Sequence, residues 1–208
     1  MRLKILLGTA IATIAMMEGY AFQPSSAIQL QDGTVYFAQP PRLVGAVTTY
    51  NDVYVWGATY YFTVSLPENA GEPLQKITIN QREGVDYIRF DLQKSFAFEG
   101  TRSDKGQKVG LKDATSDASW QAASLREASP TRLRKTKTVS LTFDPVVSPG
   151  TTITIGLKPV QNPTVAGVYL FGVTAFPAGE KSHGQFLGFG RLQFYSRGFG
   201  YFHSPFGW

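Results

Sequence analysis

The sequence predicts an all-β fold, an antiparallel Ig-like β-sandwich with a long polar excursion between two sets of strands. Two observations carry this prediction. Short stretches along the chain alternate apolar and polar side chains, so that one parity faces a core and the other faces water. Turn-forming combinations of proline, glycine, asparagine and aspartate separate these stretches at short intervals. Helical periodicity is almost absent, and the uneven strand lengths favour a sandwich.

Residues 1–27 have the order of a secretory signal peptide. A short basic start is followed by an uncharged apolar stretch that is shorter than the roughly 20 residues of a transmembrane helix. Ser25 and Ala27 are small residues at the two positions that a signal peptidase reads, so we expect cleavage after Ala27. Cleavage after Ala21 is the second choice. An uncleaved anchor or a buried helix is the alternative interpretation.

Cleavage after Ala27 leaves 181 residues, which is the size of one domain with a hydrophobic core of its own. We expect a β-sandwich domain over residues 28–195 and a C-terminal tail over residues 196–208 that is rich in aromatic residues and glycine. No later segment is long and apolar enough to cross a membrane as a helix. The chain has no cysteine, so disulfides, thiolate chemistry and thiol metal sites are excluded.

Residues 28–37 predict a tight β-hairpin. An Asp-Gly pair in the middle suits a two-residue turn with positive φ. In that register Leu30 faces Val35, and Ile28 faces Phe37. The alternative is an extended N-terminal arm.

Further strands follow along the chain, each with apolar residues of one parity. Residues 59–67, for example, place Tyr60, Phe62 and Val64 on one face. The expected strands are 42–47, 59–67, 74–80, 86–92, 95–100, 138–143, 151–157, 167–176 and 185–195.

Residues 101–137 interrupt this pattern and form the polar excursion. Within it, residues 117–129 are compatible with about two helical turns that Asp117 would cap. Trp120 and two leucines of the segment would pack against the sandwich. We expect a long connection between two strand sets and not a second domain.

The strand at residues 167–176 is apolar on both faces, because residues of either parity between 168 and 173 are apolar. A strand of an open sandwich layer normally has one face in water. The second face therefore needs a cover, and the aromatic tail is the preferred candidate, since large exposed apolar patches are rare on monomers. A binding partner is the alternative.

The net charge of the full chain is +5, and a basic run lies at the end of the excursion. Arg132, Arg134, Lys135 and Lys137 form this run, which suits anionic envelope polymers or lipid head groups. Export argues against nucleic acid as the partner. The alternative is an ordinary solvated loop.

The residues that could carry catalysis or bind metal are few. His183 and His203 are the only histidines, and they lie 20 positions apart with no acidic cluster near them. Asp86, Asp91 and Glu99 could converge for acid–base catalysis of the glycosidase type, although Asp91 has the parity that faces solvent. We predict no catalytic, metal or cofactor site and no cofactor.

A glycine-rich stretch at residues 184–194 contains Gly184, Gly188 and Gly190. It does not match a phosphate-binding fingerprint, and no helix is expected after it. These glycines are expected to permit strand bends or close packing under aromatic rings.

Five longer motifs resemble one known family. They read DGTVYFAQPPRLV, GATYYFTVSLPENAGEPLQKITINQ, TFDPVVSPGTTITIGLKPVQNP, GVYLFGVTAFPAGE and GQFLGFGRLQFY, and they extend from about residue 32 to 195. The chain is similar here to exported cyanobacterial proteins that carry a domain of unknown function of the 2808 type. The resemblance implies a secreted β-rich domain of a photosynthetic bacterium, with no known activity or site residues.

The sequence thus favours an exported, non-enzymatic protein of the cell envelope, located in the periplasm, on the outer-membrane surface or outside the cell. Its partners would be other envelope proteins or anionic envelope polymers. Two alternatives remain open. One is an enzyme that acts on envelope carbohydrate, and the other is a binding module for a glycan or another small ligand.

Overall fold

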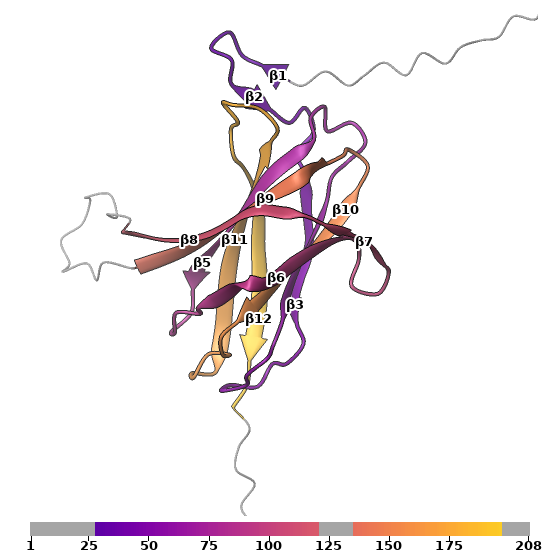
Figure 1. The fold of residues 1–208 in the computed structure, drawn as a ribbon. Helices are drawn as coiled ribbons and strands as arrows, with labels where there is room; N and C mark the ends of the chain where they lie inside the picture. The colour runs from indigo at the N-terminus through magenta and orange to yellow at the C-terminus, as the bar shows by residue number, and fades with distance from the viewer. Residues whose placement is uncertain (1–27, 121–134, 197–208) are drawn as a thin grey trace, which may run out of the picture.

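The computed structural model describes residues 28–120 and 135–196, and within them every regular element is a β-strand. Two five-stranded antiparallel sheets face each other, and a small two-stranded hairpin extends one end of the molecule (Figure 1). The predicted fold class, an all-β antiparallel sandwich, is confirmed. The expected signal peptide at residues 1–27 and nearly all of the expected tail lie outside the described residues.

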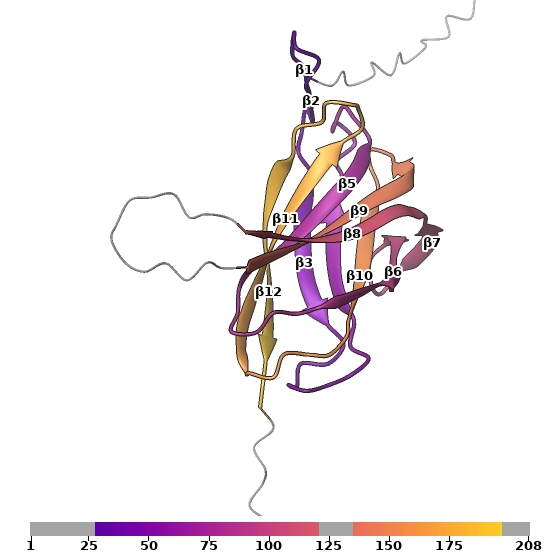
Figure 2. The same ribbon diagram turned by 60° about the vertical axis from the view of Figure 1, so that its left-hand side comes forward.

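The two sheets combine strands from distant parts of the chain (Figure 2). The first sheet has the order β3 (Arg42–Thr48), β4 (Tyr60–Ser65), β10 (Thr152–Pro159), β6 (Phe90–Gly100) and β7 (Lys105–Val109). The second has the order β12 (Gln185–Phe194), β11 (Gly167–Pro177), β5 (Leu74–Glu83), β9 (Lys135–Val147) and β8 (Leu111–Trp120).

The core lies between the sheets and is built from the residues that the alternating pattern assigns to one face. Tyr60, Phe62 and Val64 of β4 are fully buried, as the sequence predicts. Aromatic rings dominate one part of the core, where Phe171 of β11 meets the rings of Tyr60 and Phe62 edge to face at 6.2 and 5.7 Å. Other large side chains with almost no exposure are Phe37, Leu66, Leu74, Ile77, Ile79, Ile88, Leu141, Ile153, Ile155, Leu157, Tyr169 and Phe194.

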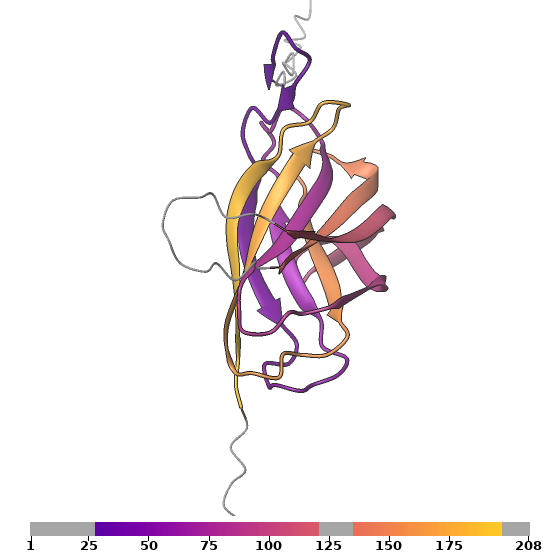
Figure 3. The ribbon, with the colours of Figure 1, turned by 90° about the vertical axis from the view of Figure 1, so that its left-hand side faces the viewer.

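The sheets approach each other along one side, where the edge strands β3 and β12 lie next to each other (Figure 3). Gly190 permits this approach, because a Cβ there would lie 2.7 Å from the Cβ of Ala46 and 2.8 Å from a ring carbon of Phe62. Gly184 lies in the same way under the ring of Phe176. The expected close packing under aromatic rings is confirmed for Gly184 and Gly190, whereas Gly188 has φ +123° and lies at an irregularity in the β11–β12 pairing.

The N-terminal hairpin forms, but its predicted register is wrong. β1 (Ile28–Gln29) pairs with β2 (Val35–Tyr36) so that Ile28 is opposite Tyr36 and not Phe37. The loop has three residues, one more than predicted. The Leu30 amide donates to the carbonyl of Thr34, and the Leu30 carbonyl accepts from the amide of Gly33. The Asp32 carboxylate accepts from both the amide and the hydroxyl of Thr34, which stabilises this longer turn.

Residues 90–100 form one strand, β6, where the sequence predicts two strands at 86–92 and 95–100. The reason is an irregularity in the pairing with β10 that changes the inward-facing residues from even to odd numbers. The hydroxyl of Ser95 fills this position, donating to the carbonyl of Asp91 at 2.8 Å and accepting from the amide of Lys158 at 3.2 Å. The apolar residues therefore alternate with one parity before the irregularity and with the other parity after it, so the sequence of one strand has the pattern of two.

Most of the described part of the polar excursion is itself β-structure, and the predicted helical cap at Asp117 is wrong. Residues 111–120 form β8, which pairs with β9 along its whole length, from Leu111 opposite Phe143 to Trp120 opposite Lys135. Pairing with a long neighbouring strand outweighs the weak local preference for a helix. Residues 121–134, with Arg132 and Arg134 of the basic run, lie outside the described residues.

The second face of β11 is partly covered by its neighbours in the sheet. Gly172 is buried, and the side chains of Phe186 and Arg82 come within 3.3 and 3.4 Å of the position of a Cβ there. Val168 at the end of the same face remains 38% exposed. The expected cover by the C-terminal tail lies outside the described residues and stays a prediction.

Candidate functional site

Exposed aromatic side chains gather at one end of the sandwich, opposite the β1–β2 hairpin (lower end in Figure 1). Three loops meet there: residues 49–59 between β3 and β4, residues 84–89 between β5 and β6, and residues 160–166 between β10 and β11. The end of β12 lies beside them. All tyrosines and tryptophans that count among the large exposed residues of the described chain are here. They are Tyr50, Tyr54, Trp56, Tyr87 and Tyr195, which together we call the aromatic end.

A buried amide fixes the loop that carries three of these residues. Asn162 is 2% exposed, and its Nδ2 donates to the carbonyls of Tyr50 at 3.0 Å and Asp52 at 2.8 Å. Its Oδ1 accepts from the hydroxyl of the core residue Tyr60 at 3.0 Å. The backbone amide of Asn162 also donates to the carbonyl of Val55 at 2.8 Å. The loop is therefore anchored to the core at three successive points.

Tyr54 has a strained backbone within this anchored loop. Its φ is +61°, and it is the only non-glycine residue of the described chain with a positive φ. Hydrogen bonds hold this conformation on both sides, because the Tyr54 amide donates to the carbonyl of Pro163 and the Tyr54 carbonyl accepts from Gln161. The result is a ring that is 59% exposed on a fixed backbone.

The end of β12 is joined to the same loop. The Tyr195 amide donates to the carbonyl of Asn51 at 2.7 Å, and its carbonyl accepts from the amide of Val53 at 3.0 Å. These two bonds extend the second sheet toward a loop of the first sheet. Tyr195 is thereby held beside Tyr50 and Tyr54.

A second buried amide fixes the loop that carries Tyr87. Gln81 is 7% exposed, its Nε2 donates to the carbonyl of Asp86 at 2.6 Å, and its Oε1 accepts from the amide of Ile88 at 3.0 Å. Gly84 turns the chain into this loop with φ +132°. A Cβ at Gly84 would lie 2.2 Å from a ring carbon of Tyr169, so only glycine fits.

The Asp86 carboxylate joins two of the three loops. Its Oδ2 accepts from the amide and the hydroxyl of Thr164 and from the amide of Val165. Burial works to raise the pKa of Asp86, but these hydrogen bonds together outweigh it and leave the pKa below the ordinary value. Asp86 is therefore ionised at neutral pH and engaged in a structural contact.

A groove of about 280 Å³ runs between these loops. Trp56 and Tyr87 line it together with the polar side chains of Asp86, Arg89, Gln161 and Thr164. We call it the Trp56–Tyr87 groove.

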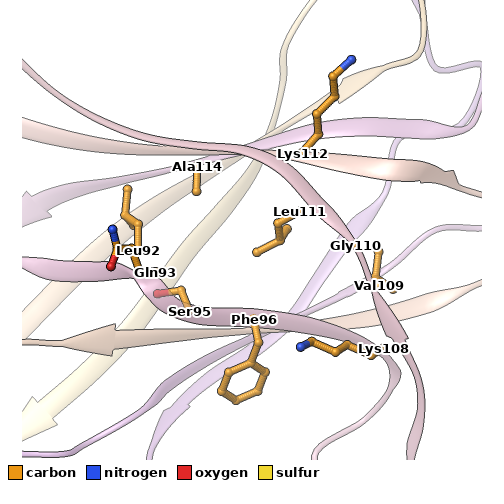
Figure 4. Close-up of a pocket in the computed structure, with 10 residues that line it drawn as sticks. All are labelled: Leu92, Gln93, Ser95, Phe96, Lys108, Val109, Gly110, Leu111, Lys112 and Ala114. Atoms are coloured by element: carbon orange, nitrogen blue, oxygen red, sulfur yellow. The ribbon is translucent and has the colours of Figure 1, made fainter.

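A larger cavity of about 440 Å³ lies elsewhere, where β6, β7 and β8 diverge (Figure 4). Leu111 points into the space between the strands, whereas Lys112 and Phe96 point away from it (Figure 4). Its lining mixes aliphatic side chains with Gln93, Ser95 and two lysines, and it contains no carboxylate or imidazole group. It continues the core at the open side of the sandwich.

The three carboxylates considered from the sequence do not form a catalytic group. Asp91 is paired with Lys94 at 2.8 Å. Glu99 lies further along β6. The β10 partners of the two residues, Lys158 opposite Asp91 and Ile153 opposite Glu99, are five positions apart, which corresponds to about 17 Å at ~3.3 Å per residue. Asp86 is occupied by Thr164 and Val165 as described. A glycosidase pair would need carboxyl groups about 5–10 Å apart, and Asp91 and Glu99 do not meet this condition.

The described histidine lies at the other end of the molecule. His183 stacks on the ring of Tyr36 at 4.5 Å, and its amide donates to the carbonyl of Val35. His203 lies outside the described residues. Within the described residues no group of three or more metal-binding side chains comes together, and no helix there is long and apolar enough to span a membrane.

Sequence reasoning missed the aromatic end. The signal is present in the loop sequence TTYNDVYVWGATYY, where large aromatic residues stand in a segment without strand alternation. The contacts that unite this loop with residues 84–89 and 160–166 are long-range, so spacing along the chain does not reveal them.

Comparisons with known proteins extend this description. No curated protein matches the chain. Among solved structures, the collagen-binding subdomain of the surface protein ACE of Enterococcus faecalis has 8% identity and a TM-score of 0.35, covering 71% of this chain and 94% of that chain. The collagen-binding domain of a Staphylococcus aureus adhesin has 10% identity and a TM-score of 0.30, covering 71% and 95%.

A third structure, of manganese lipoxygenase of Gaeumannomyces graminis with a partial structure of zonadhesin of Komagataella pastoris, has 9% identity and a TM-score of 0.34, covering 71% of this chain and 48% of that chain. None of these values supports a conclusion about function. The sequence itself matches a family over residues 34–194, which includes all strands from β3 to β12. The chain therefore belongs to the family described as Protein of unknown function (DUF2808).

Proposed function

We propose that this chain is an exported, non-enzymatic β-sandwich module of the cell envelope that binds a partner through its aromatic end. The observation that carries the proposal is the presentation of five exposed tyrosine and tryptophan side chains on loops that buried amides hold in place. Tyrosine and tryptophan are the residues most enriched at the energetic centres of binding interfaces. Loops on a rigid β-scaffold are a common location for such surfaces.

The rigidity of the loops supports binding and not only folding. A surface that is already ordered loses little conformational entropy when a partner arrives. Asn162 and Gln81 provide this order from inside the molecule, so the exposed rings themselves stay free for contact. Export is supported by the signal-peptide pattern of residues 1–27.

An enzyme that acts on envelope carbohydrate is the less favoured alternative. It would need two carboxyl groups at a defined separation in one cleft. Of the carboxylates considered, Asp86 alone lines the Trp56–Tyr87 groove, and its Oδ2 is engaged by Thr164 and Val165. This arrangement favours a binding role.

Retention on isolated cell envelope, after expression of the full chain, tests the proposal. We expect the mature protein to appear in the envelope or extracellular fractions with the mass of residues 28–208. The combined Tyr50→Ala, Tyr54→Ala and Tyr195→Ala variant should sediment with envelope at least tenfold more weakly, since truncating an interface tyrosine often costs ~1–2 kcal/mol or more.

Phe186→Ala with Phe189→Ala serves as the matched control. These two rings are 53% and 54% exposed, like the tyrosines, but they belong to β12 and lie outside the aromatic end. Cytoplasmic location of the unprocessed chain would overturn the export part of the proposal. Equal retention of the tyrosine variant and the wild type would overturn the binding part.

A further inference from the structure

The Trp56–Tyr87 groove combines flat apolar surface with polar atoms that have no partner among the residues that the structure describes. Trp56 is 66% exposed and Tyr87 is 48% exposed, so both rings are available to a ligand. Within the described residues, no hydrogen bond or ion pair engages the Arg89 guanidinium, the Asp86 Oδ1 atom or the Gln161 Oε1 atom. The groove thus offers five N–H donors and two acceptor oxygens around two aromatic rings.

We propose that this groove is a glycan-binding site, in which pyranose rings stack on Trp56 and Tyr87 while sugar hydroxyls bond to Arg89, Asp86 and Gln161. This inference rests on the proposed function, because it assigns a ligand class to the same aromatic end. A pyranose ring has an apolar face of C–H groups and a rim of hydroxyls that both donate and accept. The groove offers the counterpart of each: aromatic faces for the first and mixed donors and acceptors for the second.

The composition of the groove argues against an apolar peptide side chain as its ligand. An apolar side chain would bury the Arg89 and Asp86 charges without giving them hydrogen bonds, which is costly. A ligand with hydroxyl groups satisfies both. The charges of Arg89 and Asp86 are opposite and largely cancel. The groove therefore lacks the net positive charge that binds an anionic lipid surface.

The size and rigidity of the groove agree with a short segment of a polysaccharide. Its volume of about 280 Å³ is near the lower limit of ordinary small-molecule sites, which begin at ~300 Å³. The Asp86 carboxylate joins two of the walls through Thr164 and Val165. Gln161 is oriented by its bond to the Tyr54 carbonyl at 3.2 Å, which leaves Oε1 for the ligand.

Titration of the full chain with defined hexasaccharides tests this inference. The probes are β-1,4-linked hexamers of glucose, of N-acetylglucosamine and of a uronic acid, and the readouts are calorimetry and tryptophan fluorescence. We expect saturable binding of at least one hexamer. Trp56→Ala and Tyr87→Ala should each raise its Kd about tenfold or more, and Arg89→Met should raise it by a similar factor. Because all three side chains are exposed, thermal unfolding of the variants should match the wild type.

Phe186→Ala provides the control, since its ring is equally exposed but remote from the groove. The inference is overturned if no hexamer binds the wild type, or if Trp56→Ala and Tyr87→Ala bind as the wild type does. A separate arm measures retention on envelope whose glycans have been oxidised with periodate. Undiminished retention there would assign the aromatic end to a protein partner, which overturns the glycan inference and leaves the proposed function intact.

Discussion

Replacement of Asn162 by alanine should be among the most destabilising single changes at the aromatic end. The variant removes three side-chain hydrogen bonds at once, two to loop carbonyls and one from the Tyr60 hydroxyl. Tyr60 is fully buried, and burial, with a smaller contribution from Tyr169, raises its pKa far above the ordinary value, so its hydroxyl stays a proton donor. In the variant this donor has lost its partner.

The magnitude follows from the different surroundings of the lost bonds. An unsatisfied buried hydroxyl costs ~1–3 kcal/mol, and each loop carbonyl, which can regain water, costs ~0.5–1 kcal/mol. We therefore expect Asn162→Ala to lower the free energy of unfolding by about 3 kcal/mol. Tyr60→Phe alone leaves the Asn162 Oδ1 without its donor and should cost about 1.5 kcal/mol.

The double variant distinguishes this explanation from a simple loss of packing. With both changes present, neither the Tyr60 hydroxyl nor the Asn162 Oδ1 is left unpaired, so the double variant should cost only the two loop carbonyl bonds, about 1.5 kcal/mol in total. The coupling energy between the two residues is then about 3 kcal/mol. The assay is urea unfolding of all four proteins followed by far-ultraviolet circular dichroism, with m-values compared. Additive effects of the two changes, or a cost of Asn162→Ala below about 1 kcal/mol, would refute the reasoning.

Three further changes have definite expected outcomes. Gly84→Ala should lower the free energy of unfolding, measured by urea denaturation, by more than ~2 kcal/mol, because the new Cβ meets the Tyr169 ring at 2.2 Å and φ is +132°. The Asp86 carboxylate contributes stability above its ordinary pKa of 3.8 that is lost as pH falls through its lowered folded-state pKa. The difference in unfolding midpoint between wild type and Asp86→Asn should therefore stay constant from about pH 8 to 5 and shrink below about pH 4. Tyr54→Gly should leave thermal stability unchanged or raise it by up to ~1 kcal/mol, since glycine relieves the positive φ at +61°, while envelope retention falls.

The alternating pattern could predict the sandwich because burial in this fold follows parity closely. Ile77 and Ile79 of β5 are buried, whereas Thr78 and Asn80, of the opposite parity, are only partly buried. The pattern does not predict the register where a loop has one residue more and the types of residue in it are the same. The Asp-Gly pair of the hairpin is compatible with two-residue and three-residue loops, and the two bonds from Thr34 to the Asp32 carboxylate favour the longer one.

The candidate site could not be predicted for a different reason. Its parts are residues such as Tyr54, Tyr87 and Tyr195, which lie in three separate segments of the chain. Their association depends on the side chains of Asn162 and Gln81, whose polarity in the sequence suggests solvent exposure. The burial of such an amide depends on contacts with distant parts of the chain, so a local sequence pattern cannot predict it.

The distribution of energetically costly features supports a binding role for the aromatic end. Three of the four buried polar side chains in the described residues, Thr59, Gln81 and Asn162, lie at this end, and so does the strained backbone of Tyr54. Well-packed apolar groups usually stabilise a core at least as well as buried polar groups do. Strained backbone persists only where surrounding contacts determine it, and it is concentrated at functional sites. A module under selection for stability alone has no need to collect these features beside five exposed aromatic rings, whereas a module that must present those rings in one fixed arrangement does.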